Sequence, residues 1–311
     1  MEHYVTLFDS MFLPQGLALH ASLERHAKPY TVWVLCMDDA THQALGRLRP
    51  PHLRTLRLAS VETSELARVK GGRTRGEYCW TITPFAPLFV FEADATVERV
   101  TYLDADLWFR RNPAPIFEEF AASGKKVLIT DHHYAPEYDR SASSGQYCVQ
   151  FMTFRRGSSE PVRKWWADRC IEWCYARYED GKFGDQKYLD DWPERFAGLV
   201  HVLQQPELLL APWNATRFPY GRAVAYHFHA LMVQRRKIVL SDGHVLPTPL
   251  VRHVYAPYVS ELKGFIERLR QEGFAVPPRP QPGGVFGAIG TMIRGAAHNI
   301  WRLRSRRVVD L

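Results

Sequence analysis

The chain has 311 residues, of which 46% are hydrophobic and 23% are charged, and no low-complexity tract occurs in it. This composition is typical of a folded protein with a large core, and it argues against intrinsic disorder. The formal net charge is +7, and arginines crowd toward the end of the chain at Arg294, Arg302, Arg304, Arg306 and Arg307. A basic end of this kind favours an anionic surface as partner.

Cysteine usage and the first residues of the chain both predict a cytoplasmic protein. The cysteines are odd in number and include no Cys-x-x-Cys pair, which is typical of reduced, mostly buried thiols. They are Cys36, Cys79, Cys148, Cys170 and Cys174. The chain does not begin with a basic segment followed by an apolar one, and it has no run of about 18 apolar residues. We therefore expect neither secretion nor a membrane span.

Strands and helices alternate over the first hundred residues. Short apolar segments predict strands at residues 4–8, 31–37 and 53–59, and Pro14 suits the first turn of a helix after the first strand. A further helix is expected at about 84–92. This alternation is typical of βαβ units, so we predict an α/β fold with a mostly parallel central sheet.

The stretch at residues 100–109 is the centre of the predicted site. It is an apolar run interrupted by Asp104 and Asp106, and we interpret it as a buried strand with the two carboxylates at its carboxyl end. In extended backbone, residues two apart point to the same side, so the two charges would converge and repel. A hard divalent cation between them relieves that repulsion. A solvated turn is the alternative, because a chain of this length contains about one Asp-x-Asp by chance.

The segments that follow continue the alternation. We expect a helix to about residue 122, strands at 126–130 and 147–154, and a helix at 161–178. The trio at residues 131–133 could bind a metal, but a histidine pair in a polar loop is more often solvated. Cys170 and Cys174 lie one turn apart among tryptophans, which favours core packing over a metal site.

Five short motifs, in this order along the chain, resemble the family 8 glycosyltransferases, the group of glycogenin and bacterial lipopolysaccharide galactosyltransferases. They are Asp9-x-x-Phe12, Tyr102-Leu103-Asp104-Ala105-Asp106, Gly184-Asp185-Gln186, Trp213-Asn214 and His227-Phe228. The resemblance covers about residues 3–232. It implies a GT-A fold, in which a Rossmann-like, mostly parallel sheet is flanked by helices. It also implies a nucleotide-diphosphate sugar donor, commonly a UDP-sugar, and a bound Mn²⁺ or Mg²⁺.

The resemblance also implies roles for individual residues. The metal ligands would be Asp104, Asp106 and His227. The nucleotide-sugar contacts would come from Phe8, Asp9, Phe12, Asp104, Asp106 and Gln150. The catalytic residues facing the sugar would be Asp185 and Gln186. The acceptor contacts would come from Trp213, Asn214 and His229.

This sequence departs from the family pattern at three places. Cys148-Val149-Gln150 stands where the family commonly has Asn-x-Gly, and Trp80 stands where an arginine often follows an aromatic residue. After the histidine, residues 230–233 replace the usual glycine and the later Lys-Pro-Trp. Diphosphate contact would then come from another basic residue, for which we consider Arg235, Arg236 or Lys237.

The end of the chain is predicted to form a separate unit. Residues 275–284 form a proline-rich linker after a catalytic domain at 1–274. Residues 285–311 form a basic tail whose apolar positions recur every three to four residues up to Leu303. That pattern predicts an amphipathic helix on an anionic membrane surface. A helix docked on the protein's own core is the alternative, and we expect no nucleic-acid partner because no nucleic-acid-binding module is recognisable.

Three functions fit these observations. The first is a metal-dependent, retaining glycosyltransferase that acts on a saccharide or lipid-linked acceptor in surface glycan synthesis, such as lipopolysaccharide or capsule, at the cytoplasmic membrane face. The second is a nucleotidyltransferase or nucleotide-diphosphate-sugar hydrolase, although residues 9–12 lack the Gly-rich basic loop that it would need. The third is a non-catalytic module that binds a sugar nucleotide or a membrane.

Overall fold

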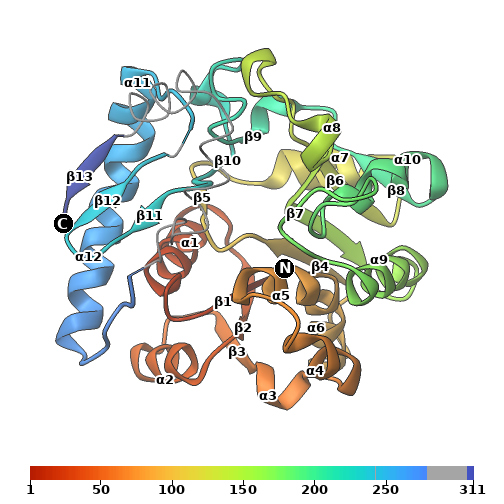
Figure 1. Ribbon diagram of the computed structural model, residues 1–311, viewed down its shortest axis with the longest axis horizontal. Coiled ribbons are helices and arrows are strands. Elements are labelled where there is room, and N and C mark those ends of the chain that lie inside the picture. Colours follow the sequence, from red (N-terminus) through yellow and green to blue (C-terminus); the bar gives the residue numbers. More distant parts are fainter. Residues whose placement is uncertain (242, 279–306) are drawn as a thin grey trace.

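The computed structural model describes residues 1–241, 243–278 and 307–311. A large mixed sheet lies in the middle of the molecule with helices on both of its faces, and a smaller unit of short strands and one long helix lies at one side (Figure 1). This is an α/β architecture, as the alternation of predicted strands and helices indicated.

The main sheet has seven strands in the described part of the chain, in the order β3-β2-β1-β4-β7-β6-β8. In that order they are β3 (Leu53–Arg57), β2 (Tyr30–Cys36), β1 (Glu2–Phe8), β4 (Arg99–Leu103), β7 (Tyr147–Arg155), β6 (Val127–Asp131) and β8 (Val200–Val202). Six of them run in one direction, and β7 is antiparallel to both of its neighbours. The sheet is therefore mostly parallel, as predicted.

Alternation along the strands creates a core on each face of this sheet. The neighbouring residues Tyr4 and Val5 on β1 are both fully buried but belong to different apolar clusters, since successive side chains point to opposite faces. One face is covered by α1 (Leu13–His26), α2 (Asp39–Leu48) and α7 (Ala114–Ser123). The other face is covered by α3 (Leu58–Val61), α4 (Ser64–Lys70), α5 (Arg75–Ile82), α6 (Ala86–Ala93), α9 (Glu160–Glu172) and α10 (Trp192–Arg195).

Two small sheets complete the fold in the described residues. The first is built from β5 (Leu107–Phe109), β10 (Ala225–His227) and β9 (Leu209–Leu210). The second is built from β11 (Met232–Val233), β12 (Lys237–Val239) and β13 (Val308–Asp310). Short helical segments connect the elements: α8 (Ser141–Ser144), η1 (Thr83–Phe85), η2 (Pro136–Tyr138), η3 (Lys187–Asp191), η4 (Pro206–Leu208) and η5 (Tyr220–Arg222).

A long helical stretch packs beside the small sheets. It begins with α11 (Thr248–Leu250), continues through the π-helical turn η6 (Val251–Tyr255) and ends with α12 (Ala256–Gln271). Its apolar side joins Tyr226 and Phe228 in one cluster, and the Phe228 and Tyr258 rings stack at 3.6 Å between centroids. No helix within residues 1–241, 243–278 and 307–311 has both the length and the apolar character to cross a bilayer.

The predicted strand at residues 100–109 is wrong in one respect, because it is two strands in two sheets. Strand β4 ends at Leu103 and β5 begins at Leu107, whose amide donates to the Asp104 carbonyl at 3.1 Å. The residues between them form a turn. The two carboxylates therefore converge because the chain turns, and not because extended backbone points them to one side.

Two further boundaries differ from the prediction. The expected strand at 53–59 ends at Arg57, where α3 begins. The expected helix at 161–178 ends at Glu172, since Trp173 adopts an extended conformation with φ of −153°. Both predicted elements are too long at their carboxyl ends, and element ends are the least certain part of such a prediction.

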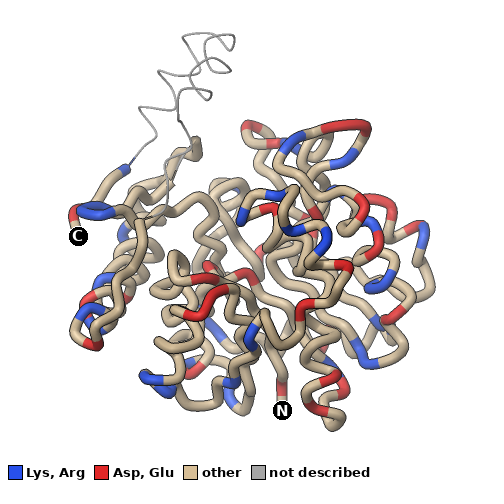
Figure 2. The backbone as a smooth tube through the Cα atoms, turned by 60° about the horizontal axis from the view of Figure 1, so that its bottom comes forward, with Lys and Arg blue, Asp and Glu red and all other residues tan. Residues whose placement is uncertain are grey.

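The predicted amphipathic helix and most of the predicted linker lie outside the described residues, so the domain boundary at 274 stays a prediction. The last residues are described, and they form β13, which pairs antiparallel with β12. This end of the tail is a strand and does not continue a helix. Basic and acidic residues are interspersed over most of the described backbone (Figure 2).

A glycine on α1 controls how closely this helix approaches the end of β1. A Cβ atom on Gly16 would lie 2.4 Å from two ring carbons of Phe8, which is itself buried. Gly46, near the end of α2, has no atom within 4 Å of the same position. The two glycines thus form a matched pair, one crowded and one open.

We expect Gly16→Ala to reduce the free energy of unfolding by about 1–3 kcal/mol, because the Phe8 ring must leave its packed position. Gly46→Ala should increase it by about 0.4–1 kcal/mol, since only the unfolded chain loses freedom. Urea unfolding followed by circular dichroism measures both. Equal effects of the two substitutions would contradict the close approach of α1 to Phe8.

Candidate functional site

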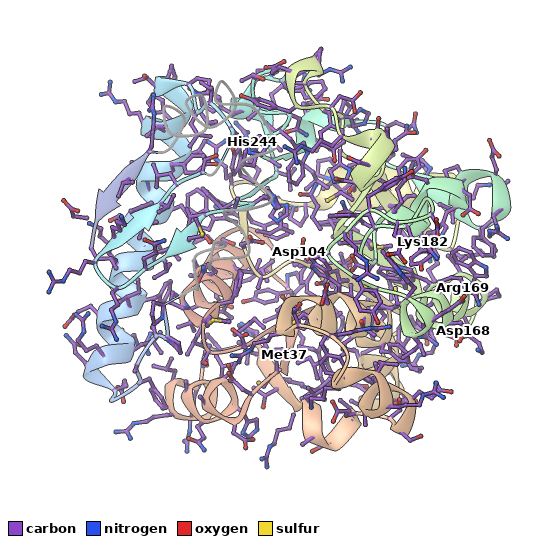
Figure 3. All side chains as sticks on the ribbon, in the orientation of Figure 1. Met37, Asp104, Asp168, Arg169, Lys182 and His244 are labelled. Carbon is purple, nitrogen blue, oxygen red and sulfur yellow. The ribbon has the colours of Figure 1, made fainter. Side chains whose placement is uncertain are left out.

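Two carboxylates and one imidazole meet at the turn between β4 and β5. Strand β10 pairs antiparallel with β5 and places His227 opposite Leu107, directly beside that turn. The Nε2 atom of His227 lies 3.0 Å from Asp106 Oδ1 and 3.6 Å from Asp104 Oδ2. One ligand atom from each residue lies within 4.8 Å of the others. Asp104 lies near the middle of the view in Figure 3.

The electrostatics of this group reflect burial and mutual charge. Burial raises the pKa of Asp104 to about 6, an effect that the His227 imidazolium opposes and that the Asp106 charge reinforces. Burial alone would lower the pKa of His227, but the charge of Asp106, its hydrogen bond and the contributions of Cys148 and Asp104 together outweigh burial and hold that pKa well above its usual range. Without a cation, Asp104 and His227 therefore keep their protons to a higher pH than isolated side chains do, which reduces the repulsion between the carboxylates.

This donor set fits a hard divalent ion. Two carboxylate oxygens and one imidazole nitrogen suit Mn²⁺ or Mg²⁺, since oxygen ligands dominate. The carboxylate side chains of Asp104 and Asp106 are 23% and 15% exposed, so the group is open to solvent on one side. Positions remain free there for oxygen atoms of a ligand. The predicted trio of Asp104, Asp106 and His227 is thus brought together by the fold.

Neighbouring groups hold the carboxylates in place. The Tyr102 hydroxyl donates to Asp104 Oδ1 at 3.0 Å, and the Asp104 amide donates to the Gln150 carbonyl at 3.0 Å. The Asp106 carbonyl accepts from the Phe228 amide. Tyr102 was not among the predicted site residues, although its place two residues before Asp104 could have indicated this role.

The predicted catalytic residues lie beside this group. Asp185 is only 3% exposed, and its Oδ2 atom has no hydrogen-bond partner among the described residues. Burial raises the pKa of Asp185 far above its usual range, and the negative charge of Asp104 contributes in the same direction. The Trp166 indole donates to the Asp185 carbonyl at 2.8 Å and fixes the backbone. Asp185 is therefore close enough to Asp104 to share an electrostatic environment.

Gln186 and Gln150 differ in how their amides are used. The Gln186 Nε2 atom donates to the Ser144 carbonyl at 2.7 Å, which orients its amide. Gln150 is 1% exposed, and both amide atoms lack a partner among the described residues. A buried amide without partners costs free energy, on the order of 1–3 kcal/mol, which a polar ligand could offset.

Three of the predicted nucleotide-sugar contacts, Phe8, Asp9 and Phe12, lie between the end of β1 and the start of α1. Phe8 is buried in the core under α1, so its contribution is to packing, whereas Phe12 is partly exposed. The Arg75 guanidinium contacts Asp9 Oδ2 at 2.5 Å and Asp38 Oδ2 at 2.6 Å. Burial raises the pKa of Asp9, and Arg75 opposes this effect. Arg75 is the first residue of α5, and its sequence position alone did not indicate this role.

The three predicted acceptor residues differ in exposure. Trp213 is 5% exposed and stands edge-on to His227 and His229, with ring centroids 5.4 and 5.2 Å away. Asn214 is fully buried, and its amide contacts the His132 carbonyl at 2.9 Å and the Ala211 amide at 2.8 Å. A direct acceptor contact does not fit Asn214, because its polar atoms hold two loops together. His229 is exposed.

His132 and Cys148 form a second buried group, which interacts with the His227 imidazole. His132 was expected to be solvated, but it is 3% exposed, stacks on Tyr134 and lies 3.0 Å from the Gln146 carbonyl. The Cys148 thiol lies between His132 and His227. Burial raises the pKa of Cys148, but the two histidines outweigh it and lower that pKa to about 7. The family pattern already pointed to position 148 as unusual.

The basic residues considered for diphosphate contact lie elsewhere. Arg235 and Arg236 occupy the turn between β11 and β12 and line a surface pocket with Lys263, Arg270 and the last two residues of the chain. The Leu311 amide donates to the Arg236 carbonyl at 3.0 Å. This pocket shares no residue with the metal group.

Comparison with known proteins agrees with this architecture. No family model matches the chain. It is 30% identical over 280 residues to the uncharacterized protein YfnF of Bacillus subtilis, covering 86% of this chain and 87% of YfnF.

Solved structures are similar at lower identity. Mouse xyloside xylosyltransferase 1 matches with a TM-score of 0.51 and 14% identity, over 73% of this chain and 97% of that chain. The galactosyltransferase LgtC, solved with donor and acceptor sugar analogs, matches with a TM-score of 0.52 and 13% identity, over 84% of this chain and 95% of that chain. These likenesses confirm the predicted GT-A fold.

The raised pKa of Asp104 gives a pH-dependent prediction. Between the usual value of 3.8 and about 6, the folded carboxyl binds more protons than the unfolded chain, so its ionisation destabilises the fold as pH rises. Asp104→Asn should therefore gain stability relative to the metal-free wild type as pH rises from about 4 to about 7, by on the order of 2 kcal/mol.

Urea unfolding in the presence of a chelator measures this difference. Asp168→Asn is the matched control, because Asp168 is an exposed carboxylate on α9 that pairs with Lys164. Its difference from wild type should stay nearly constant with pH. A gain for Asp104→Asn that shrinks as pH rises would contradict the buried repulsion.

Proposed function

We propose that this chain, which belongs to the same family as YfnF of Bacillus subtilis, is a metal-dependent glycosyltransferase. It would move a hexosyl group from a nucleotide-diphosphate sugar, in our proposal a UDP-sugar, to a saccharide or lipid-linked acceptor. The observation that carries this proposal is the meeting of Asp104, Asp106 and His227 at the ends of the strands of a GT-A fold. Open α/β sheets bind ligands at that place.

The residues of the chain have distinct tasks in this reaction. Asp104, Asp106 and His227 would hold Mn²⁺ or Mg²⁺, and the cation, when bound, would neutralise the diphosphate and stabilise charge on the leaving group. Tyr102 keeps Asp104 in position through its hydroxyl. The exposed side of the carboxylates leaves room for the diphosphate oxygens.

The donor would lie between β1 and β7. Asp9, fixed by Arg75, can accept a hydrogen bond from the imide of a uracil base, and the partly exposed ring of Phe12 can pack against that base. The unpartnered amide of Gln150 and the unpartnered Oδ2 atom of Asp185 supply the buried hydrogen-bonding groups that sugar hydroxyls require. Asp185 would thereby orient the sugar.

Retention of configuration fits the residues at the proposed anomeric position. Inversion needs a general base near the acceptor hydroxyl, on the face opposite the leaving group. Gln186 is an amide that takes no proton at neutral pH, and its Nε2 atom is already used to contact Ser144. Its carbonyl can stabilise positive charge on the sugar, while the leaving diphosphate accepts the proton of the acceptor.

The place of action in this proposal is the cytoplasmic face of a membrane. The arginines after residue 290 would attract anionic lipid, and a lipid-linked or growing saccharide of a surface glycan, such as lipopolysaccharide or capsule, would be the acceptor. Trp213 would act indirectly, by supporting His227 and the exposed His229.

A panel of nucleotide-diphosphate sugars tests the activity through release of the nucleoside diphosphate. We expect release that depends on Mn²⁺ or Mg²⁺ and rises when an acceptor saccharide is added. Asp106→Asn should reduce turnover by at least about 10²-fold, the scale of losing one electrostatic stabiliser, with little loss of folding.

Asp168→Asn serves again as the control for removing one carboxylate, and it should keep full activity. If Asp106→Asn turns over at the wild-type rate in saturating Mn²⁺, the metal assignment is wrong. Release that acceptors never increase would favour a nucleotide-diphosphate-sugar hydrolase.

Gln186→Ala should slow transfer by about 10² to 10³ with a smaller effect on the donor KM, because it removes a group that acts on developing charge. Gln204→Ala is the control, as Gln204 is exposed and its side chain donates to the nearby Val202 carbonyl. NMR of the first-formed linkage reports the anomer. A product of opposite configuration to the donor would sink the retaining reading and point to a carboxylate base such as Asp185.

A further inference from the structure

A second concave site lies at the other end of β5 from the metal group. It is a cavity of about 350 Å³. It is lined by Arg25, His26, Trp108, Arg110, Arg111, Gly221 and His253. Its volume falls in the range of about 300–1,000 Å³ that small-molecule sites have. Lining residues come from α1, the end of β5, η5 and η6, so four separate segments build it.

The side chains that line this cavity carry positive charge and no negative charge. Arg25 pairs with Glu261, at 2.5 Å to one carboxylate oxygen and 3.2 Å to the other, and the Trp108 indole also donates to Glu261. Arg110 and Arg111 donate only to backbone carbonyls, of Tyr220 and Gly221. Neither has a carboxylate partner in residues 1–241, 243–278 or 307–311. Two positive charges are therefore uncompensated by the described residues.

The two guanidinium groups are nevertheless fixed in position. Both backbone amides donate to the Val224 carbonyl, at 2.7 Å from Arg110 and 3.2 Å from Arg111. The carbonyls of η5 hold the side chains, and a neutral carbonyl orients a guanidinium without cancelling its charge. Each guanidinium has five N–H donors, so donors remain free to meet a ligand. Burial and the neighbouring Arg111 charge lower the pKa of Arg110, which shows the free-energy cost of this arrangement.

Other arginines, such as Arg156 and Arg217, also donate to backbone carbonyls, but Arg110 and Arg111 are adjacent in the chain and line one cavity. Arg75 and Arg163, in contrast, contact carboxylates. Fixed arginine forks without carboxylate partners match the geometry of phosphate oxygens. Trp108 also lines the cavity, and the Arg25 guanidinium lies over its ring at 5.6 Å from the centroid.

We propose that this cavity binds a phosphate group carried on a small molecule or on a lipid headgroup, with Arg110 and Arg111 as its principal contacts. This site is distinct from the metal group. Asp106 and Arg110 are four residues apart along an extended segment, which separates them by about 13 Å at 3.3 Å per residue. The inference does not rest on the proposed transfer reaction.

Isothermal titration calorimetry of the full chain with inorganic phosphate and with glycerol 3-phosphate, in chloride buffer, tests the site. We expect a Kd below about 1 mM for glycerol 3-phosphate and a loss of at least about tenfold in the double variant Arg110→Gln, Arg111→Gln. Arg222→Gln is the control and should bind normally. Arg222 belongs to η5, but it pairs with Glu207 and does not line the cavity. Asp104→Asn should also bind normally, since its metal group lies elsewhere.

Arg111→Gln alone provides a second test if the double variant folds poorly, because Arg111 is exposed. It should also lose affinity while its thermal unfolding stays like that of the wild type. Absence of binding by the wild type, or binding that none of the cavity substitutions weakens, would overturn the proposal.

Sedimentation with vesicles separates the two sources of phosphate. Vesicles of phosphatidylglycerol and of phosphatidylcholine are compared for the wild type and the double variant, with the whole tail present in both. If the double variant loses binding to phosphatidylglycerol along with glycerol 3-phosphate, the ligand is a lipid headgroup. If it loses only glycerol 3-phosphate, the ligand is a soluble phosphorylated molecule.

Discussion

Mutual repulsion between Asp104 and Asp106 is the constraint on which the rest of the site depends. The chain ends β4 at Leu103, turns through both carboxylates and starts β5 in another sheet, so the two charges are held close together. Pairing of β10 with β5 then brings His227 to within 3.0 Å of Asp106. Holding two carboxylate charges close together in a mostly buried turn costs free energy. A divalent cation between them offsets that cost.

Around this turn the protein keeps several buried polar groups without partners in the described residues. Gln150 has two such atoms and Asp185 has one. The Gln150 carbonyl accepts from the Asp104 amide, and burial together with the Asp104 charge raises the pKa of Asp185. Each such atom costs on the order of 1–3 kcal/mol, and cores normally avoid them. By contrast, Asn214 is as deeply buried but fully hydrogen-bonded, which marks it as a support for the loops. Other buried atoms, such as Trp33 Nε1 and Tyr258 Oη, also lack a partner among the described residues, so it is the proximity of Gln150 and Asp185 to Asp104 that carries our proposal of a ligand.

Much of the fold and part of the candidate site were predictable from the sequence, for physical reasons. Apolar runs separated by helical segments predicted the parallel sheet, and the aspartates after one run predicted a metal site. His227 came from the family resemblance. A turn at the aspartates was only the alternative, because the apolar residues on both sides of Asp104 and Asp106 favour one continuous strand. The roles of Arg75 and Cys148 could not be predicted, since they come from residues distant in sequence, Asp9 and His132. The complete burial of Asn214 was not predictable either, because it depends on tertiary packing.

Crystals grown with Mn²⁺ and a nucleoside diphosphate, with data collected at the manganese absorption edge, test the central claim most directly. The account predicts one strong anomalous peak, bound by Asp104, Asp106 and the Nε2 atom of His227, with diphosphate oxygens completing the coordination. Metal–oxygen distances should be about 2.0–2.6 Å, as for other hard cations. A peak bound elsewhere, for example between Asp9 and Asp38, or a bound nucleotide with no metal at this turn, would contradict it.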